Sequence, residues 1–573
     1  MAYMFQDCKK IEYLDFTNFE TTASTDFFMM FKNCEKLTSL NLENFESNNV
    51  EDMSYMFQGC SALKSIQLSN KFDTSLVNDM SYMFQMCVNL ISLDLSMFNT
   101  KNVGDMSYMF SSCRSIESLD LRSFNTENVQ DMSYMFQMCY KLESIDLSSF
   151  NVENVNTFKY MFANDLKLKV LDLSSFRPIR GKEFTSMFSS SPLESIKLTN
   201  FETKSAIDMS SMFDGNQYLL SLDLSKFNTE NVENMSHMFT GLKSLTSIDL
   251  SSFKTENVRS MEHMFENCNK LTSLNLDHFS TPNLSACQNM FNNCYELKFL
   301  SLSNFRTDKS EDISSMFSGC RSLTSIDISK FQTSKVQYFS SMFSSCGSLT
   351  NIDLSNLDTS SGIYFSNMFS GCYSLTSIDL SRFKMGLATT ISSMFTNCSS
   401  LEKIDLSNWD AKNIKNMDYA FKECSKLKEL NVANLNMGSL SSIDNLFNDC
   451  KSLTSIDLSG WETKSLIFMS NLFMGCTNLK SINIEKFDTS QVTGFSYVFA
   501  NCESIEYLDL SNLKSDLVRS MQHMFDGCTQ LKKVDISKFE TDATMDMRSM
   551  FKGCTSLTSL DLSNFYTKIG RAH

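Results

Sequence analysis

Residues 106–131 read MSYMFSSCRSIESLDLRSFNTENVQD, and close variants of this string follow one another along nearly the whole chain. Its phenylalanine belongs to a column that runs from Phe5 to Phe551 and recurs about every 26 residues, which gives 22 repeats. In such an array each repeat contacts only its neighbours, so the length of 573 residues does not imply several domains. We therefore expect one elongated solenoid over residues 1–567, truncated at both ends, and a non-repeat tail at 568–573 that we interpret as translated sequencing adapter.

A short strand is predicted in each repeat. The segment Leu245–Ser251, LTSIDLS, alternates apolar and polar residues, which is typical of a strand with one buried face. It also fits the L-x-x-L-x-L strand motif of leucine-rich repeats. Stacked about 4.8 Å apart, such strands form a parallel sheet along one side of a right-handed solenoid.

The M-S-x-M-F segment that opens each repeat predicts a short helix on the opposite side. Its methionines and phenylalanine, three and four residues apart, share one helical face. Residues such as Asp52 and Asp131 precede the segment as N-caps, and glycines such as Gly59 follow it as C-caps. Because helices are wider than strands, we expect the stack to bend with the parallel β-sheet on its concave face and the helices on its convex face.

The 19 cysteines form a column of their own, from Cys8 to Cys554, with Cys287 as the exception. A disulfide framework uses varied spacings, whereas this column puts each sulfur beside its own copy one layer away. Side chains stacked in parallel do not point their Cβ vectors at one another, so we predict buried free thiols rather than bridges. Four consecutive repeats within residues 162–242 replace the cysteine by Asp165, Ser191, Asn216 and Leu242.

Together these columns carry a specific resemblance. Met109–Thr126 (MFSSCRSIESLDLRSFNT) and Met316–Thr333 (MFSGCRSLTSIDISKFQT) resemble the repeats of BspA-like leucine-rich repeat surface proteins. The resemblance implies a bacterial or protist protein that is surface-associated or secreted, often adhesive, and has no catalytic residues. The first residues, MAYMFQDCKK, have no apolar segment of a secretion signal, so a cytoplasmic location is the alternative.

Aspartates recur in the strand column that is expected to point outward on the concave face, with serines on either side. This acidic, hydroxyl-rich stripe suits a basic protein segment, a glycan or Ca²⁺ shared between carboxylates. A solvating face copied by repeat expansion explains it equally well. Phe299 beside Ser301 is either an apolar contact site or drift. The candidate binding residues are Asp223, Asp249, Asp327, Asp353, Asp379, Asp405 and Phe299.

Charge and composition argue against several classes of function. A net charge of −16 without clustered Lys and Arg disfavours nucleic acid and anionic membranes as partners. The sequence has no run of about 18 apolar residues that predicts a transmembrane segment. His237, His263 and His523 share an exposed helix column, and we find no recurring nucleophile or carboxylate partner for them at triad or metal spacing. We therefore predict no catalysis, no metal and no cofactor.

The sequence thus predicts a non-catalytic, monomeric binding or adhesion protein of the cell surface, or a secreted one, that engages a protein or glycan ligand on its Asp/Ser face. The alternative is an intracellular leucine-rich-repeat scaffold for protein–protein interaction. The 19 thiols and the lack of a signal sequence favour this alternative.

Overall fold

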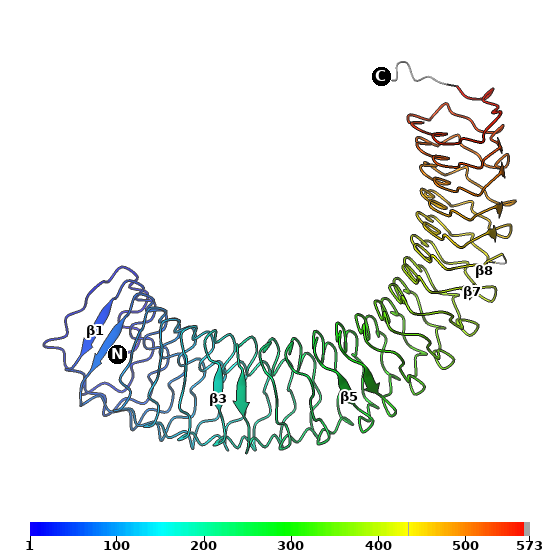
Figure 1. Cartoon of the computed structure of the whole chain (residues 1–573). Helices are drawn as coiled ribbons and strands as arrows, with labels where there is room; N and C mark the ends of the chain where they lie inside the picture. Colours follow the sequence, from blue (N-terminus) through cyan, green and yellow to red (C-terminus); the bar gives the residue numbers. More distant parts are fainter. Residues whose placement is uncertain (434, 567–573) are drawn as a thin grey trace. The chain divides into compact units, whose positions relative to one another are not determined.

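A computed structural model of the chain describes residues 1–433 and 435–566. The chain forms two compact units, Met1–Asn283 and Leu284–His573, and each is a stack of successive coils (Figure 1). One coil corresponds to one sequence repeat, and within each unit its backbone is hydrogen-bonded to the neighbouring coils. The predicted parallel-strand solenoid is confirmed. The predicted tail at 568–573 lies outside the described residues.

Strands of three or four residues form in the segment where the sequence predicts them. The N-terminal unit contains β1 (Ser39–Leu42), β2 (Ser65–Leu68), β3 (Val170–Asp172), β4 (Ser195–Lys197) and β5 (Ser273–Asn275). The C-terminal unit contains β6 (Phe299–Ser301), β7 (Lys403–Asp405), β8 (Glu429–Asn431), β9 (Ser455–Asp457), β10 (Ser481–Asn483), β11 (Tyr507–Asp509) and β12 (Lys533–Asp535). Their side chains alternate between core and surface, as in β9, where Ile456 is buried between two exposed neighbours.

The strands pair in parallel and two by two: β1 with β2, β3 with β4, β7 with β8, β9 with β10 and β11 with β12. Equivalent positions of the repeat lie opposite each other, as Ile456 lies opposite Ile482. In other repeats the same segment forms no strand, for example at residues 116–121. Within each unit the strand side is therefore an intermittent sheet.

The M-S-x-M-F segment is not helical, which corrects the sequence prediction. Residues 53–60 form successive β-turns, each closed by an N–H to C=O bond three residues back at 3.1–3.3 Å. Tyr55 and Gly59 have φ angles of 59° and 71°, in the left-handed region that a right-handed helix does not use. Residues 1–433 and 435–566 contain no helix, and so none that is long and apolar enough to cross a membrane.

The spacing between coils explains why turns replace helices. The rings of Phe57 and Phe84, in the buried phenylalanine column of adjacent coils, stack with centroids 5.4 Å apart. An α-helix with its side chains is about 10 Å wide, so helices cannot stack at this spacing. A turn segment can stack at this spacing, because alternate backbone N–H groups point to the next coil. The N–H of Tyr55, for example, donates to Ser81 O at 2.9 Å.

We call the side of the coils that carries this turn segment the turn face, and the side that carries the strands the strand face. Neighbouring coils lie closer together on the turn face than on the strand face. Stacked rings of Tyr55 and Tyr82 on the turn face are 4.3 Å apart, whereas those of Phe124 and Phe150, which follow the strand segment, are 6.4 Å apart. The C-terminal unit is concave on its turn face and convex on its strand face. Figure 1 shows the strand arrows of the C-terminal unit along the outer side of its bend. In this unit the prediction of a sheet on the concave face is wrong, because that prediction assumed wide helices on the opposite face.

The buried columns are the ones that the sequence predicts. All 19 cysteines are free, and all but Cys8 and Cys554 are buried. Thiols of the cysteine column donate to the phenylalanine carbonyl one coil earlier, as from Cys60 Sγ to Phe31 O at 3.1 Å. Burial raises the pKa of these thiols, to about 12 for Cys372, so they stay protonated at neutral pH. The predicted ladder of buried free thiols is confirmed.

We expect the cysteines to react slowly in the folded protein, because the thiolate is the reactive form and these thiols are buried and neutral. A thiol reagent added without denaturant should label mainly the half-buried Cys8 and Cys554, and all 19 cysteines after unfolding in urea. Rapid labelling of most thiols in the native protein would contradict the buried ladder.

Where polar residues replace the cysteine, most keep its hydrogen bond. Ser191 Oγ and Asn216 Nδ2 each donate to the phenylalanine carbonyl of the preceding coil at 2.7 Å. Asp165 differs, because its carboxyl is fully buried, its Oδ1 accepts the N–H of Cys139 at 2.9 Å, and its Oδ2 has no hydrogen-bond partner. Burial raises the pKa of Asp165 well above the ordinary value. One buried, protonated carboxyl thus lies within the ladder.

Candidate functional site

The aspartates of the predicted binding stripe are all exposed on the strand face. They are Asp223 and Asp249 in the N-terminal unit and Asp327, Asp353, Asp379 and Asp405 in the C-terminal unit. Each carboxylate accepts the backbone N–H of the serine two residues on, at 2.9 or 3.0 Å. This bond closes the turn that follows the extended segment. A structural role therefore explains why the column is uniform.

The fold needs an oxygen acceptor at this position but not a negative charge. Asn41 Oδ1 accepts the N–H of Glu43 at 2.9 Å, and Asn275 Oδ1 accepts that of Asp277 at 3.0 Å. Asparagine thus makes the same turn. The charge of the aspartates is available for other interactions.

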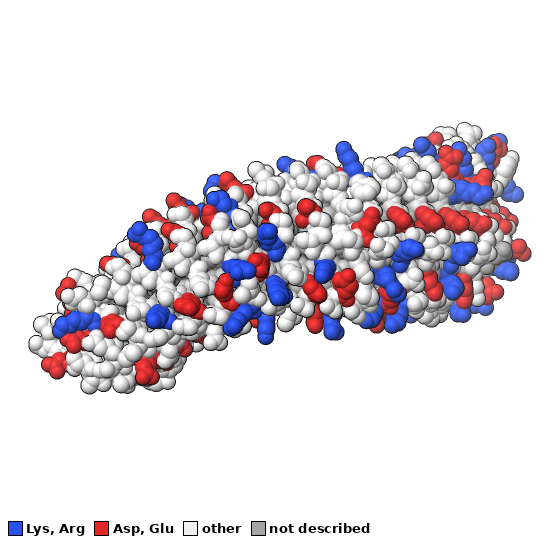
Figure 2. Space-filling model, turned by 90° about the horizontal axis from the view of Figure 1, so that it is seen from below, with Lys and Arg blue, Asp and Glu red and all other residues white. Residues whose placement is uncertain are grey.

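The stripe is fully ionised at neutral pH. The serine N–H bond is the main cause that lowers the pKa of Asp327, Asp353 and Asp379 below the ordinary value. The negative charge of Asp353 acts to raise the pKa of Asp327 and of Asp379, because adjacent carboxylates repel each other. Figure 2 shows a row of acidic side chains along the surface of the C-terminal unit. The stripe is therefore a line of negative charge at repeat spacing, although Lys330 acts on Asp327 and Arg382 acts on Asp353 and Asp379.

A shallow depression of about 610 Å³ lies on the strand face over β7 to β10. Its lining includes Asp405 and Asp457, and also Lys403, which forms an ion pair of 3.0 Å with Glu429. Phe299, in β6, is 57% exposed and does not line this depression. Of the predicted residues, the structure thus brings Asp405 into a hollow and leaves Phe299 as a separate apolar side chain.

The turn face carries a row of stacked aromatic side chains that was not predicted from the sequence. The rings of Tyr55, Tyr82, Tyr108 and Tyr134 stack at 4.2–4.4 Å. Burial is the main cause that raises the pKa of Tyr82 to about 12, so its hydroxyl is protonated at neutral pH. The sequence signal was tyrosine recurring at the repeat period. A helical interpretation of the segment gave no reason to expect stacking.

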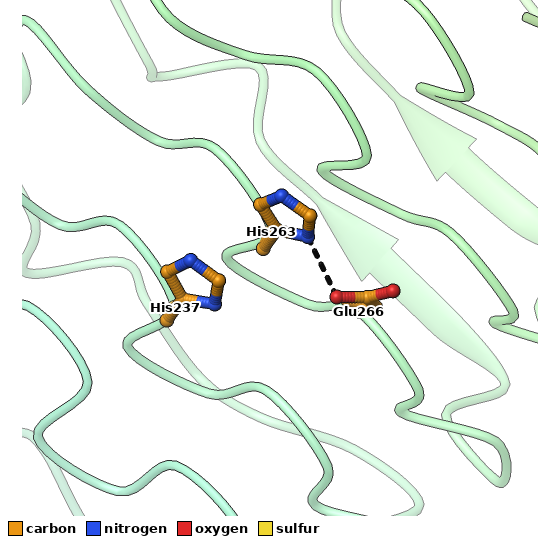
Figure 3. A group of neighbouring side chains, drawn as sticks. All are labelled: His237, His263 and Glu266. Atoms are coloured by element: carbon orange, nitrogen blue, oxygen red, sulfur yellow. Dashed lines mark hydrogen bonds and ion pairs between the residues drawn. The ribbon is translucent and has the colours of Figure 1, made fainter.

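Three side chains that are able to hold a metal ion meet on the turn face of the N-terminal unit (Figure 3). His237 and His263 occupy the same position in consecutive coils, and their rings stack with centroids 4.4 Å and planes 7° apart. His263 Nδ1 lies 2.6 Å from Glu266 Oε2. The ligand atoms of all three half-buried residues lie within 4.8 Å of one another. Burial is the main cause that lowers the pKa of His237, which keeps its ring neutral at neutral pH.

The prediction that the three histidines are exposed is wrong, because each is half-buried, and the prediction that they lack a carboxylate partner is wrong for two of them. His263 pairs with Glu266, and His523 pairs with Asp526 at 2.7 Å. In both cases the carboxylate follows three residues after the histidine, and the β-turn brings it beside the ring. The sequence signal was the His-x-x-Glu and His-x-x-Asp spacing.

Comparisons with known proteins identify a repeat family. The sequence profile of the family described as "Mycoplasma protein of unknown function, DUF285" matches residues 1–69, 62–176, 182–300, 285–404, 364–482, 389–507 and 467–569. A comparison with curated protein sequences found no match.

Solved structures of bacterial leucine-rich repeat proteins are also similar to the chain. One, from Bacteroides ovatus, is 16% identical, with 87% of this chain and 91% of that chain covered and a TM-score of 0.28. A leucine rich cell surface protein from Faecalibacterium prausnitzii is 17% identical, with 70% and 85% covered and a TM-score of 0.26. TM-scores this low do not bear on what the present chain binds.

Proposed function

Because the chain belongs to the DUF285 family of BspA-like leucine-rich repeat proteins, we propose that it is a non-catalytic scaffold that binds a positively charged protein segment along its acidic strand face. The supporting observation is the column from Asp327 to Asp405, four exposed carboxylates in consecutive coils whose charge the fold does not need. In this proposal the protein acts at the cell surface or after secretion.

Electrostatics favours an extended basic partner. A Lys- or Arg-rich segment laid along the column meets one carboxylate per coil and relieves the repulsion between them. The convex strand face is open along its length, so a linear segment can follow it. The serine hydroxyls beside the aspartates add hydrogen-bond partners. A neutral glycan is the alternative ligand, and its binding is expected not to depend on these charges.

The free cysteines fit the proposed location as well as the intracellular alternative. All 19 are unpaired, and 17 of them are buried. Buried thiols with raised pKa values react slowly with oxidants, so they persist outside the cell. Protease treatment of intact producing cells distinguishes the two locations: a surface protein is digested and an intracellular scaffold is protected.

Replacing Asp327, Asp353, Asp379 and Asp405 together by Asn is expected to weaken binding of a Lys-rich peptide by about 4-fold or more. Exposed ion pairs contribute about 0.2–1 kcal/mol each, and four are lost. The fold should persist because Asn41 already makes the same turn. Isothermal titration calorimetry measures the affinity at about 0.01 M and about 0.15 M salt, where screening lengths of about 30 and 8 Å predict weaker binding at the higher value.

The matched control removes four charges from the turn face by replacing Asp52, Asp79, Asp105 and Asp131 with Asn. Asparagine is compatible with this column, since Asn234 Oδ1 accepts the N–H of Ser236 at 3.0 Å. The control should leave peptide affinity nearly unchanged. Equal losses in both variants would show that only net charge matters, and would refute a site on the strand face.

A further inference from the structure

We propose that His237, His263 and Glu266 form a binding site for a divalent transition-metal ion of the Zn²⁺ type on the turn face of the N-terminal unit. The site goes beyond the proposed binding function and does not depend on it. Imidazole nitrogen and carboxylate oxygen are the ligands that Zn²⁺ accepts in sites with two histidines and one glutamate. Their ligand atoms already lie within 4.8 Å of one another.

The solenoid brings the two histidines together through its stacking register. His237 N–H donates to Glu262 O in the next coil at 2.9 Å, which fixes His263 directly beside His237. Both residues have left-handed φ angles, 56° and 57°, so their side chains leave the backbone in the same direction. Glu266 N–H donates to His263 O at 3.0 Å and closes the turn that places the carboxylate next to the ring.

The groups around the three side chains suit a dication. All three are half-buried, which strengthens electrostatic interactions relative to a fully exposed site. Glu262 and Glu266 both act electrostatically on His237, and Asp214 interacts with Glu266. A bound ion therefore lies close to the carboxylates of Glu262, Glu266 and Asp214 and is attracted by them. It also replaces the direct contact between His263 Nδ1 and Glu266 Oε2, because both atoms become ligands of the ion.

Two adjustments are required. The two rings are parallel, and ring nitrogens bind metals in the plane of the ring, so one ring has to turn for both lone pairs to converge. His237 is the ring that can turn, since its Nδ1 has only a long contact of 3.5 Å to Thr240 Oγ1. The 2.6 Å contact between His263 Nδ1 and Glu266 Oε2 also has to widen, because the ion lies between these two atoms. Three protein ligands leave a coordination position open for water or for a ligand group.

The chain contains a natural control for this site. His523 and Asp526 repeat the histidine–carboxylate pair at 2.7 Å, but a tyrosine, Tyr497, stacks on His523 at 4.6 Å where the second histidine would lie. Lys552 Nζ also lies 3.9 Å from Asp526 Oδ2. Two ligands beside a cation are expected to bind a divalent ion much more weakly than the proposed site.

The test is titration of the folded full-length chain with Zn²⁺ by calorimetry, and with Co²⁺ by absorption spectroscopy. We expect one ion per chain at the proposed site. His237→Tyr copies the Tyr497–His523–Asp526 arrangement, so the fold tolerates it, and should weaken Zn²⁺ binding by at least about 10-fold, the loss typical of removing even an outer-shell partner. His523→Asn should leave the affinity unchanged.

Binding of the metal ion by cysteine thiolates must be distinguished from binding at the proposed site. The Co²⁺ spectrum should lack the near-ultraviolet thiolate-to-cobalt charge-transfer band, because the thiols are buried and protonated. Added Zn²⁺ should also slow amide hydrogen exchange in residues 235–268 of the parent chain but not of His237→Tyr. A thiolate band, an unchanged affinity in His237→Tyr, or a loss in His523→Asn would each overturn the proposal.

Discussion

Replacing Phe343 by Ala is expected to destabilise its part of the solenoid by about 3–5 kcal/mol, the usual cost of removing a buried phenylalanine ring. Phe343 is 0% exposed, and its ring stacks between those of Phe317 and Phe369 at 5.5 and 5.6 Å. Its backbone N–H donates to Met368 O, and alanine retains this bond. The loss is therefore one of packing. Hydrogen exchange of amides in residues 317–369 should speed up by more than about 100-fold, since 1.4 kcal/mol corresponds to a factor of ten.

Phe299→Ala is the matched control in the same unit. This ring is 57% exposed, so its removal should change the local unfolding free energy by less than about 0.5 kcal/mol. If exchange around Phe343 were unchanged in Phe343→Ala, the phenylalanine column would not be the main packing element of the solenoid. Equal effects of the two substitutions would lead to the same conclusion.

Replacing Asp165 by Asn is expected to stabilise the N-terminal unit at neutral pH. The carboxyl of Asp165 is fully buried, and its Oδ2 has no hydrogen-bond partner. Asparagine keeps the acceptor for the N–H of Cys139 and supplies a donor without taking up a proton, as Asn216 does when its Nδ2 donates to the phenylalanine carbonyl of the preceding coil. Because asparagine is neutral, the folded chain neither buries a negative charge at this position nor has to bind a proton to remove it.

The pH dependence separates this effect from a general change in packing. Burial raises the folded-state pKa of Asp165, so between the ordinary aspartate pKa and that raised value the folded state binds more protons than the unfolded state. The stability of the parent protein therefore falls as pH rises through this range. The advantage of Asp165→Asn should be small near pH 4 and grow towards pH 7.

Hydrogen exchange of residues 136–191, measured at both pH values and corrected for the intrinsic rates, reports this difference. The reverse change, Asn216→Asp, places a second carboxyl in the same buried column and should destabilise the unit more at pH 7 than near pH 4. A stability difference between Asp165→Asn and the parent that does not vary with pH would show that Asp165 is not protonated in the folded chain.

Part of the candidate site followed from the sequence. Alternation in LTSIDLS predicts that the aspartates point outward, and all six are exposed. That they also close a turn came from the structure, although the Asp-x-Ser spacing is a known signal for such a turn. The pairing of His263 with Glu266 was available from their spacing of three residues, which brings the two side chains together in a helix as well as in a turn, whereas the stacking of His237 on His263 came only from the structure.

The sequence by itself determined the repeat period, the buried columns and the ladder of free thiols. Each coil contacts its own copies, so a column of one apolar residue type is buried as a column, and no long-range information is needed. Only the tertiary structure decided the conformation of the M-S-x-M-F segment and the direction of the bend. Apolar residues three and four apart fit a helix and a turn segment alike, and Tyr55 gives no sequence signal for its left-handed φ. The close spacing of stacked coils excludes helices about 10 Å wide, and that spacing exists only once the coils have packed against each other.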